Sequence, residues 1–237
     1  MSALLDSLAV GFEGDAARRA ALDATLATGL PGPRSEAWKY TSLRALERRS
    51  FVAPQTDAAV DTDLLAAIPA PRLVFVNGRL SAALSDAGAA VAGLSIGTLA
   101  DAGALPEIDT RDDAVFARLN DALARDGASV SVEGGARIDS PVHLVFVGAP
   151  AEGDLAWHLR HHVVLGEGAA LTLVEHHLDT GTHRHLDNTI ISLRVADRAE
   201  LHHVRLQHRG IGATSFLRTD AELQTASTYT RVDVEAG

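Results

Sequence analysis

The feature that most constrains this fold is a short pattern that occurs three times in the second half of the chain. The pattern begins with two apolar residues separated by one other residue, continues through a turn of small or polar residues and ends on an apolar residue. It covers 130–138, 163–171 and 193–201, and its starts lie 33 and then 30 residues apart. A strand–turn–strand unit of this size cannot bury its apolar side alone, so successive units must stack. The repeat therefore predicts a β-solenoid whose inward side chains line up from coil to coil.

The strands of this solenoid can be placed from the turn residues between them. Gly, Asp and Ala residues separate apolar runs, and the best candidates are Val142–Val147, Leu159–Leu165, Leu171–His177, Thr189–Val195 and Leu201–Gln207. An inward ladder requires matching residues one repeat apart, and Val163 matches Leu193 while Leu165 matches Val195. The final residues, 232–237, resemble 130–136, so we expect the sequence to stop as another coil begins and to be the front portion of a longer protein.

The first half of the chain reads as helical with a small strand insertion. Asp15 is placed to cap a helix over Ala16–Thr28, and Ser35 a second over Glu36–Arg48; a third is expected over Arg111–Arg125. Arg72–Val76 reads as a buried strand, and Asn77-Gly78 predicts a hairpin turn after it. We therefore expect an α+β protein, with a mainly helical region over 1–128 and the first coils of a right-handed parallel β-helix over 129–237.

Composition excludes several classes of function. No apolar run approaches the ~18 residues that span a bilayer, and the N-terminus lacks the basic start of a secretory signal. The chain has no cysteine, hence no disulfide, thiolate nucleophile or cysteine-held metal. A net charge of −10 argues against nucleic-acid binding. The pairs Arg18-Arg19 and Arg48-Arg49 are isolated, and we expect them to be solvated.

All histidines follow residue 142, which raises the question of a metal site. They are His143, His158, His161, His162, His176, His177, His183, His185, His202, His203 and His208. His183-Arg-His185 resembles the start of a cupin metal site, but the expected Glu does not follow. Neighbours such as His161 and His162 must face opposite sides of a strand. We expect histidines paired with carboxylates or backbone on half-buried sheet faces, with a partner-binding wall or a metal site as alternatives.

Other catalytic arrangements are weakly indicated. Glu175 and Glu167 have no evident second carboxylate across a cleft, as a glycosidase pair would need. Asp179 and Asp187 flank an expected loop and read as turn residues. No Gly-x-Ser-x-Gly elbow is present, and Gly166-Glu-Gly168 lacks the following helix of a phosphate site. We therefore predict no catalytic, cofactor-binding or metal-ligating residue in this chain.

Two motifs lie in order ahead of the solenoid. The first is the segment from Arg34 to Leu43, which contains Glu-Ala-Trp-Lys-Tyr-Thr-Ser-Leu. The second runs from Phe116 through Leu-Asn-Asp to Asp-Gly127, and is followed by a strand and Ser140-Pro-Val142. The first resembles a motif near the start, and the second the entry into the β-helix, of the SufB/SufD family of scaffold subunits of the SUF iron–sulfur cluster assembly machinery.

The resemblance implies a non-catalytic, cytoplasmic scaffold. It implies pairing with a SufB-like subunit through the β-helix and with a SufC-like ATPase, mainly through a C-terminal segment outside this sequence. It also implies that no cofactor is bound by this chain alone and that the assembled complex handles the iron–sulfur cluster. Absence of cysteine makes SufB itself the poorer match within the family. The alternatives are a β-helix carbohydrate-active enzyme and a cupin-type histidine-ligated metalloenzyme.

Overall fold

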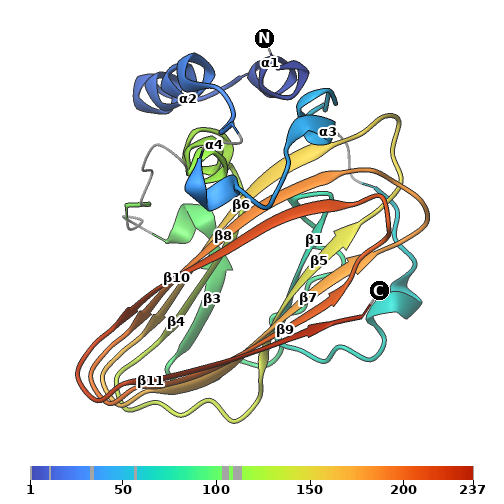
Figure 1. Cartoon of the computed structure of the whole chain (residues 1–237). Coiled ribbons are helices and arrows are strands. Elements are labelled where there is room, and N and C mark those ends of the chain that lie inside the picture. The colour runs from blue at the N-terminus through green and yellow to red at the C-terminus, as the bar shows by residue number, and fades with distance from the viewer. Residues whose placement is uncertain are drawn as a thin grey trace.

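The computed structural model describes residues 2–10, 12–32, 35–55, 58–102, 107–108 and 114–236. Two β-sheets face each other in these residues, and a layer of helices covers the outer face of one of them (Figure 1). The predicted α+β architecture, with N-terminal helices and a β-solenoid, is confirmed.

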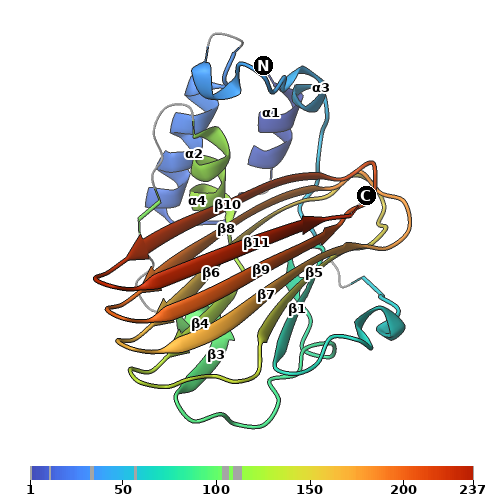
Figure 2. The same cartoon turned by 60° about the horizontal axis from the view of Figure 1, so that its bottom comes forward.

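The sheets contain six and five strands. The six-stranded sheet has the order β11-β9-β7-β5-β1-β2, formed by β11 (Thr228–Glu235), β9 (Glu200–His208), β7 (Ala170–Asp179), β5 (Val142–Gly148), β1 (Arg72–Val76) and β2 (Arg79–Leu80). The five-stranded sheet has the order β10-β8-β6-β4-β3, formed by β10 (Thr214–Leu223), β8 (Leu186–Val195), β6 (Ala156–Leu165), β4 (Ala128–Val132) and β3 (Leu94–Thr98). From β4 onward the chain alternates between the sheets, so successive strands of one sheet are parallel and stack as coils (Figure 2).

The register confirms the ladders predicted from the repeat. Val163 pairs with Leu193 and Leu165 with Val195 in the five-stranded sheet, and Val130 pairs with Val163 as the 33-residue spacing requires. The described residues complete four coils, β4–β5, β6–β7, β8–β9 and β10–β11.

The predicted match between 232–237 and 130–136 is wrong in register. Val232 lies in β11 of the six-stranded sheet, opposite Val204, whereas Val130 lies in β4 of the other sheet. The true partner of Leu193 in the last coil is Ala221, 28 residues later. The coil length shortens along the solenoid, so an apolar–x–apolar similarity alone misplaces the fourth repeat.

The first half supplies strands as well as helices. β1 lies parallel to β5, and Asn77-Gly78 turns the chain into β2 as predicted, with Asn77 at φ 48° and Gly78 at φ 76°. β3 lies antiparallel to β4. The six-stranded sheet is therefore extended by β1 and β2, and the five-stranded sheet by β3, all of which precede the solenoid in sequence.

The helices are α1 (Ala3–Ala9), α2 (Ala16–Thr28), α3 (Arg44–Glu47) and α4 (Val115–Leu123), with short 3₁₀ turns at Glu36–Trp38, Thr62–Leu65 and Leu99–Asp101. The prediction for α2 is confirmed, since the Asp15 side chain accepts a hydrogen bond from Arg18 N at 2.9 Å. The helix predicted over Arg111–Arg125 corresponds to α4, and residues 111–113 of that prediction lie outside the described residues. No helix of the described chain is both long and apolar enough to cross a membrane.

The predicted helix over Glu36–Arg48 is wrong, because it is broken into a 3₁₀ turn and α3. Trp38 packs against Phe116 and Phe216, with ring centroids 5.6 and 6.0 Å away, while Leu43 and Leu46 are buried in the same helical layer. One straight helix would point these three side chains in different directions. Thr41-Ser42, which are weak helix formers, lie at the break.

The inside of the solenoid changes character from the first coils to the last. Leu73, Leu144, Glu175, Arg205 and Asp233 occupy one inward ladder across β1, β5, β7, β9 and β11. The ladder begins with leucines in the apolar core and continues with alternating charges. This change places a polar network between the sheets where a solenoid would ordinarily hold aliphatic side chains.

Candidate functional site: a charged network between the sheets

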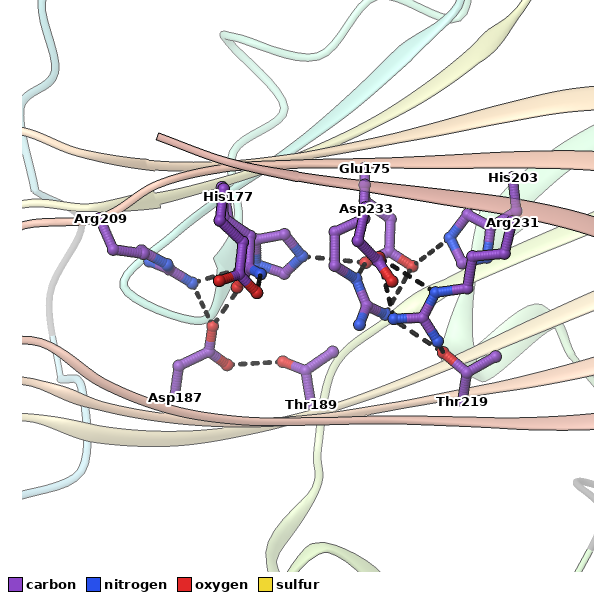
Figure 3. Close-up of polar contacts among 12 residues, drawn as sticks. Glu175, His177, Asp187, Thr189, His203, Arg209, Thr219, Arg231 and Asp233 are labelled. Carbon is purple, nitrogen blue, oxygen red and sulfur yellow. Dashed lines mark hydrogen bonds and ion pairs between the residues drawn. The ribbon is translucent and has the colours of Figure 1, made fainter. Parts of the chain in front are cut away.

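Residues from five strands and one corner loop meet inside the solenoid (Figure 3). Those from the six-stranded sheet are Glu175, His177, His203, Arg205, Tyr229, Arg231 and Asp233; those from the five-stranded sheet are Asp187, Thr189 and Thr219; Arg209 comes from the corner between β9 and β10. Strand alternation fixes this placement, because every second residue of each strand faces inward.

Glu175 is the centre of the network and is 1% exposed. His177 Nε2 lies 2.9 Å from Oε2 and His203 Nε2 lies 2.8 Å from Oε1. The Arg205 guanidinium donates to both carboxylate oxygens, from Nε at 2.8 Å and from Nη2 at 3.3 Å. The carboxylate thus accepts four hydrogen bonds, which fills its acceptor sites.

The network also joins the two sheets. Arg205 Nη2 donates to Thr219 Oγ1 of the opposite sheet at 3.2 Å. Arg209 donates to Asp187 of β8 and, at 3.1 Å, to His177 Nδ1 of β7. The coils beyond the apolar core are therefore held closed by ion pairs and hydrogen bonds.

The electrostatics follow from burial and pairing. Burial by itself would raise the pKa of Glu175, but the hydrogen bonds from His177 and His203 and the charge of Arg205 hold it well below its usual range. For Asp187, burial is outweighed by the Arg209 charge and by His177, and its pKa is also lowered. In contrast, burial lowers the pKa of His161 to about 4, so this imidazole is neutral near pH 7.

The arrangement suits structure better than catalysis. Two imidazole Nε2 atoms beside one carboxylate are ligand types of a mononuclear metal site, but Arg205 already occupies both Glu175 oxygens. Among the described residues, no group of three or more His, Asp or Glu side chains has a geometry that could hold a metal ion. Glu175 is enclosed, so it has no access to a substrate.

Asp187 corrects one prediction from the sequence. It reads as a turn residue, but it lies within β8, 2% exposed, and accepts a hydrogen bond from Thr189 at 2.6 Å. Asp179 ends β7 and binds Arg209 Nη1 at 2.9 Å and Gly210 N at 2.7 Å. Both carboxylates therefore belong to the charged interior rather than to exposed turns.

The predicted histidine motifs are dispersed. His161 faces inward against Phe75 and Phe146 and accepts a hydrogen bond from Ala128 N, whereas His162 lies on the outer face, where the Arg194 and Arg160 charges act on it. The cupin-like pair, His183 and His185, is stacked with ring centroids 4.2 Å apart.

His185 and Glu167, which the sequence offered to the alternative sites, are both bonded to other residues of the chain. His185 uses Nδ1 to accept from Leu155 N and Nε2 to bond to Ala149 O, so neither nitrogen is available to a metal. Glu167 pairs with Arg198 on the surface. The jelly-roll fold that a cupin requires is replaced here by the solenoid.

The arginine pairs expected to be solvated are in part structural links. Arg18 of α2 donates to Ala122 O and Ala124 O at the end of α4. Arg49 bonds to Asp154, Arg184 O and Thr214, which lie on three successive corners of the solenoid. Two isolated basic pairs in sequence thus connect distant parts of the fold.

Sequence reasoning did not single out His203, Arg205 or Arg209 as a group with Glu175. The available signal was alternation: Glu175 and His177, like His203 and Arg205, are two residues apart on strands of known period. Charged residues at inward positions break the usual apolar pattern of a solenoid. If the register between β7 and β9 is unknown, these charged residues look only like an irregular alternation of apolar and polar residues.

Comparison with known proteins agrees with this architecture. Residues 146–237 match the family described as "SUF system FeS cluster assembly, SufBD core domain". The chain is 33% identical over 211 residues to the iron–sulfur cluster assembly protein SufD of Escherichia coli (strain K12), covering 87% of this chain and 49% of that protein. It is 26% identical over 241 residues to an iron–sulfur cluster assembly SufBD family protein of Synechocystis, covering 93% of this chain and 53% of the relative.

The chain thus spans about half the length of the curated relatives that it matches. The matched core domain begins in β5 and includes every later strand, so it contains the whole charged network. The shared core domain, the identity over most of the sequence and the observed β-solenoid together identify this chain as a SufD-like protein of the SufB/SufD family.

Proposed function

We propose that this chain is a non-catalytic scaffold of the SUF iron–sulfur cluster assembly machinery. The observation that carries the proposal is the SufBD core match over the coils from β5 to β11. The saturated bonding of Glu175 supports it, because the strongest acid–base cluster in the described chain is engaged in holding the coils together. In this proposal the protein works in the cytoplasm and binds no cofactor by itself, and the assembled complex handles the cluster.

The proposed partners are a SufB-like subunit, bound through the solenoid, and a SufC-like ATPase. A solenoid presents flat outer walls that suit a protein partner. On the outer wall of the six-stranded sheet, Val232 and Val234 are 50% and 47% exposed, beside Val204 and Leu206 in register. This apolar stripe is the part of the wall that we assign to partner contact.

Affinity purification of the tagged native protein from its own cells tests the pairing. SufB-like and SufC-like subunits should co-purify, and the double substitution Val232→Glu/Val234→Glu should weaken recovery of the SufB-like subunit at least tenfold. Val91→Glu is the matched control, since this valine is 40% exposed on a loop before β3. Recovery of the protein without either subunit would refute the proposal.

The absence of a resident cofactor is tested separately. The purified chain should contain no stoichiometric iron, zinc or flavin by metal analysis and absorbance, and should show no lyase or hydrolase activity on polyuronates. Stoichiometric metal or such activity would favour an enzyme instead.

A further inference from the structure

A cavity lies between the helical layer and the rim of the solenoid, apart from the charged network. Its volume is about 480 Å³, which is within the range of small-molecule sites. Segments that are distant in sequence form its walls: α1 and the loop after it, residues 51–55, the turn between β1 and β2, the end of α4 and the start of β6. A ligand in this cavity would therefore contact both layers of the fold.

The buried part of the cavity wall is apolar and aromatic. Phe51 and Trp157 line it and are 3% and 5% exposed. Trp157 is fixed in place, because the Gly78 backbone lies so close that a Cβ there would come within 2.3 Å of Trp157 Cβ. On another side, the His185 ring packs edge-on against the indole at 5.6 Å. The wall is thus a rigid surface that suits a flat aromatic body.

The same wall contains a buried imidazole whose tautomer is defined by its neighbours. His158 of β6 lines the cavity and is 8% exposed. Asn188 Nδ2 donates to Phe116 O at 2.8 Å, which fixes the orientation of the amide, and the same nitrogen lies 2.9 Å from His158 Nδ1. Because an amide nitrogen only donates, Nδ1 accepts and the proton of the neutral ring is on Nε2. Burial lowers the pKa of His158 to about 4, which keeps the ring neutral.

The Nε2–H group of His158 points to a ligand. This nitrogen is buried and has no hydrogen-bond partner among the described residues. A buried donor without an acceptor is costly, and small-molecule sites characteristically place a few such polar groups in an apolar wall. A ligand that fits the cavity should therefore carry a hydrogen-bond acceptor.

The exposed part of the wall favours an anionic acceptor. Arg79 and Arg125 both line the cavity. Arg125 uses Nη1 to bond to Glu13, whose side chain is 80% exposed, and its other N–H groups can donate to a second acceptor. Asp126 is engaged with the backbone, since it accepts from Leu80 N at 2.9 Å. The guanidiniums are thus better placed than the carboxylates to bind a ligand.

We propose that this cavity binds a small aromatic anion, an aromatic carboxylate or sulfonate, as an exchangeable ligand and not as a resident cofactor. The ring of the ligand packs on Phe51 and Trp157, and an anionic oxygen accepts from His158 Nε2. Arg79 and Arg125 balance its charge. Because the cavity joins α1 and α4 to β6, the bound ligand fastens the helical layer to the solenoid.

Quenching of tryptophan fluorescence by anilinonaphthalene sulfonate, an aromatic anion, tests the proposal in the Trp38→Phe chain. The sequence has two tryptophans, and Trp38 packs on Phe116 and Phe216 and does not line the cavity. Trp157 is then the reporter. The probe should quench its emission saturably, as binding at one site requires.

Ala53→Phe and His158→Phe, each added to the Trp38→Phe chain, locate the probe. Ala53 lines the cavity from an exposed position, so a phenyl ring there fills the space without entering the core, and the affinity should fall by roughly tenfold or more. His158→Phe keeps a ring and removes the Nε2–H donor, and should weaken binding about tenfold. Ala27→Phe, at an exposed position of α2 outside the cavity wall, is the matched control and should leave the affinity unchanged.

The outcomes that would overturn the proposal are distinct. Absence of saturable quenching would show that the cavity does not accept an aromatic anion. An affinity that Ala53→Phe leaves unchanged would place the probe elsewhere, and this variant decides the question if His158→Phe does not fold. An affinity that a folded His158→Phe leaves unchanged would refute the role of the buried donor.

Discussion

At the scale of single residues, the interior shows how a buried charge is tolerated. Glu175 is stable as a carboxylate because four donors surround it and not because water reaches it. Surface pairs such as Glu167–Arg198, whose side chains are 63% and 64% exposed, are of a different kind. Solvent screens an exposed pair, and its contribution is small.

Replacing Glu175 by Ala should therefore be severely destabilising. The substitution leaves Arg205 and two imidazoles in the interior without their acceptor, and breaking a buried pair in this way costs about 3–5 kcal/mol. Glu167→Ala, the matched control, should cost about 0–1 kcal/mol. Urea denaturation measures both, and equal costs would show that the interior network contributes no more than a surface pair.

At the scale of elements, amide side chains attach the helical layer to the solenoid. Asn120 of α4 donates to Leu159 O at 2.8 Å and to Asn188 O at 2.9 Å. In the opposite direction, Asn188 of β8 donates to Phe116 O of α4 at 2.8 Å. The helix is thus fixed in position over β6 and β8 by three buried hydrogen bonds.

Asn120→Ala should loosen this layer. The strand carbonyls of Leu159 and Asn188 would each lose a buried donor, at a cost of about 1–3 kcal/mol for each unsatisfied group. Limited proteolysis should then cut between α2 and the solenoid faster than in the unaltered chain. Thr28→Ala, an exposed position bonded within its own helix, should leave the cleavage rate unchanged; an unchanged rate in Asn120→Ala would mean that apolar packing alone holds α4.

How much could be predicted from the sequence varied with the range of the interactions. α2, β1 with its Asn77-Gly78 turn and the Val163–Leu193 ladder depend on local signals, and each was predicted correctly. The break after Trp38 depends on Phe216, which lies far along the chain. The charged interior depends on the register of β7 against β9, and no local pattern contains that information.

At the scale of the whole molecule, buried neutral histidines set the response to acid. Burial lowers the pKa of both His158 and His161 to about 4. In the unfolded chain these groups return to about 6.5, so the unfolded state binds more protons between pH 4 and 6.5. Stability that is present above pH 6.5 is therefore lost as the pH falls through this interval.

His158 and His161 alone predict a loss that approaches about 2.7 kcal/mol per pH unit within the interval, and His176, whose pKa burial also lowers to about 4, adds to it. Thermal unfolding between pH 4.5 and 7.5 measures the slope, and His161→Asn should reduce it. His202→Asn, at an exposed position, should leave the slope unchanged. A slope that does not change in His161→Asn would assign the acid response to other groups.

The inward ladder changes from leucines to charged residues along the solenoid. Its coils therefore cannot replace one another, as the units of repeat proteins usually can. Exchanging the second coil, β6–β7, with the third, β8–β9, would preserve the direction of every strand. It would nevertheless set Arg205 beside Leu144 and Glu175 beside Asp233, so that two anions become neighbours and Arg205 keeps only one of its two acidic neighbours. Each coil accepts only its present neighbours, so this solenoid carries a fixed order that recombination of its modules could not preserve.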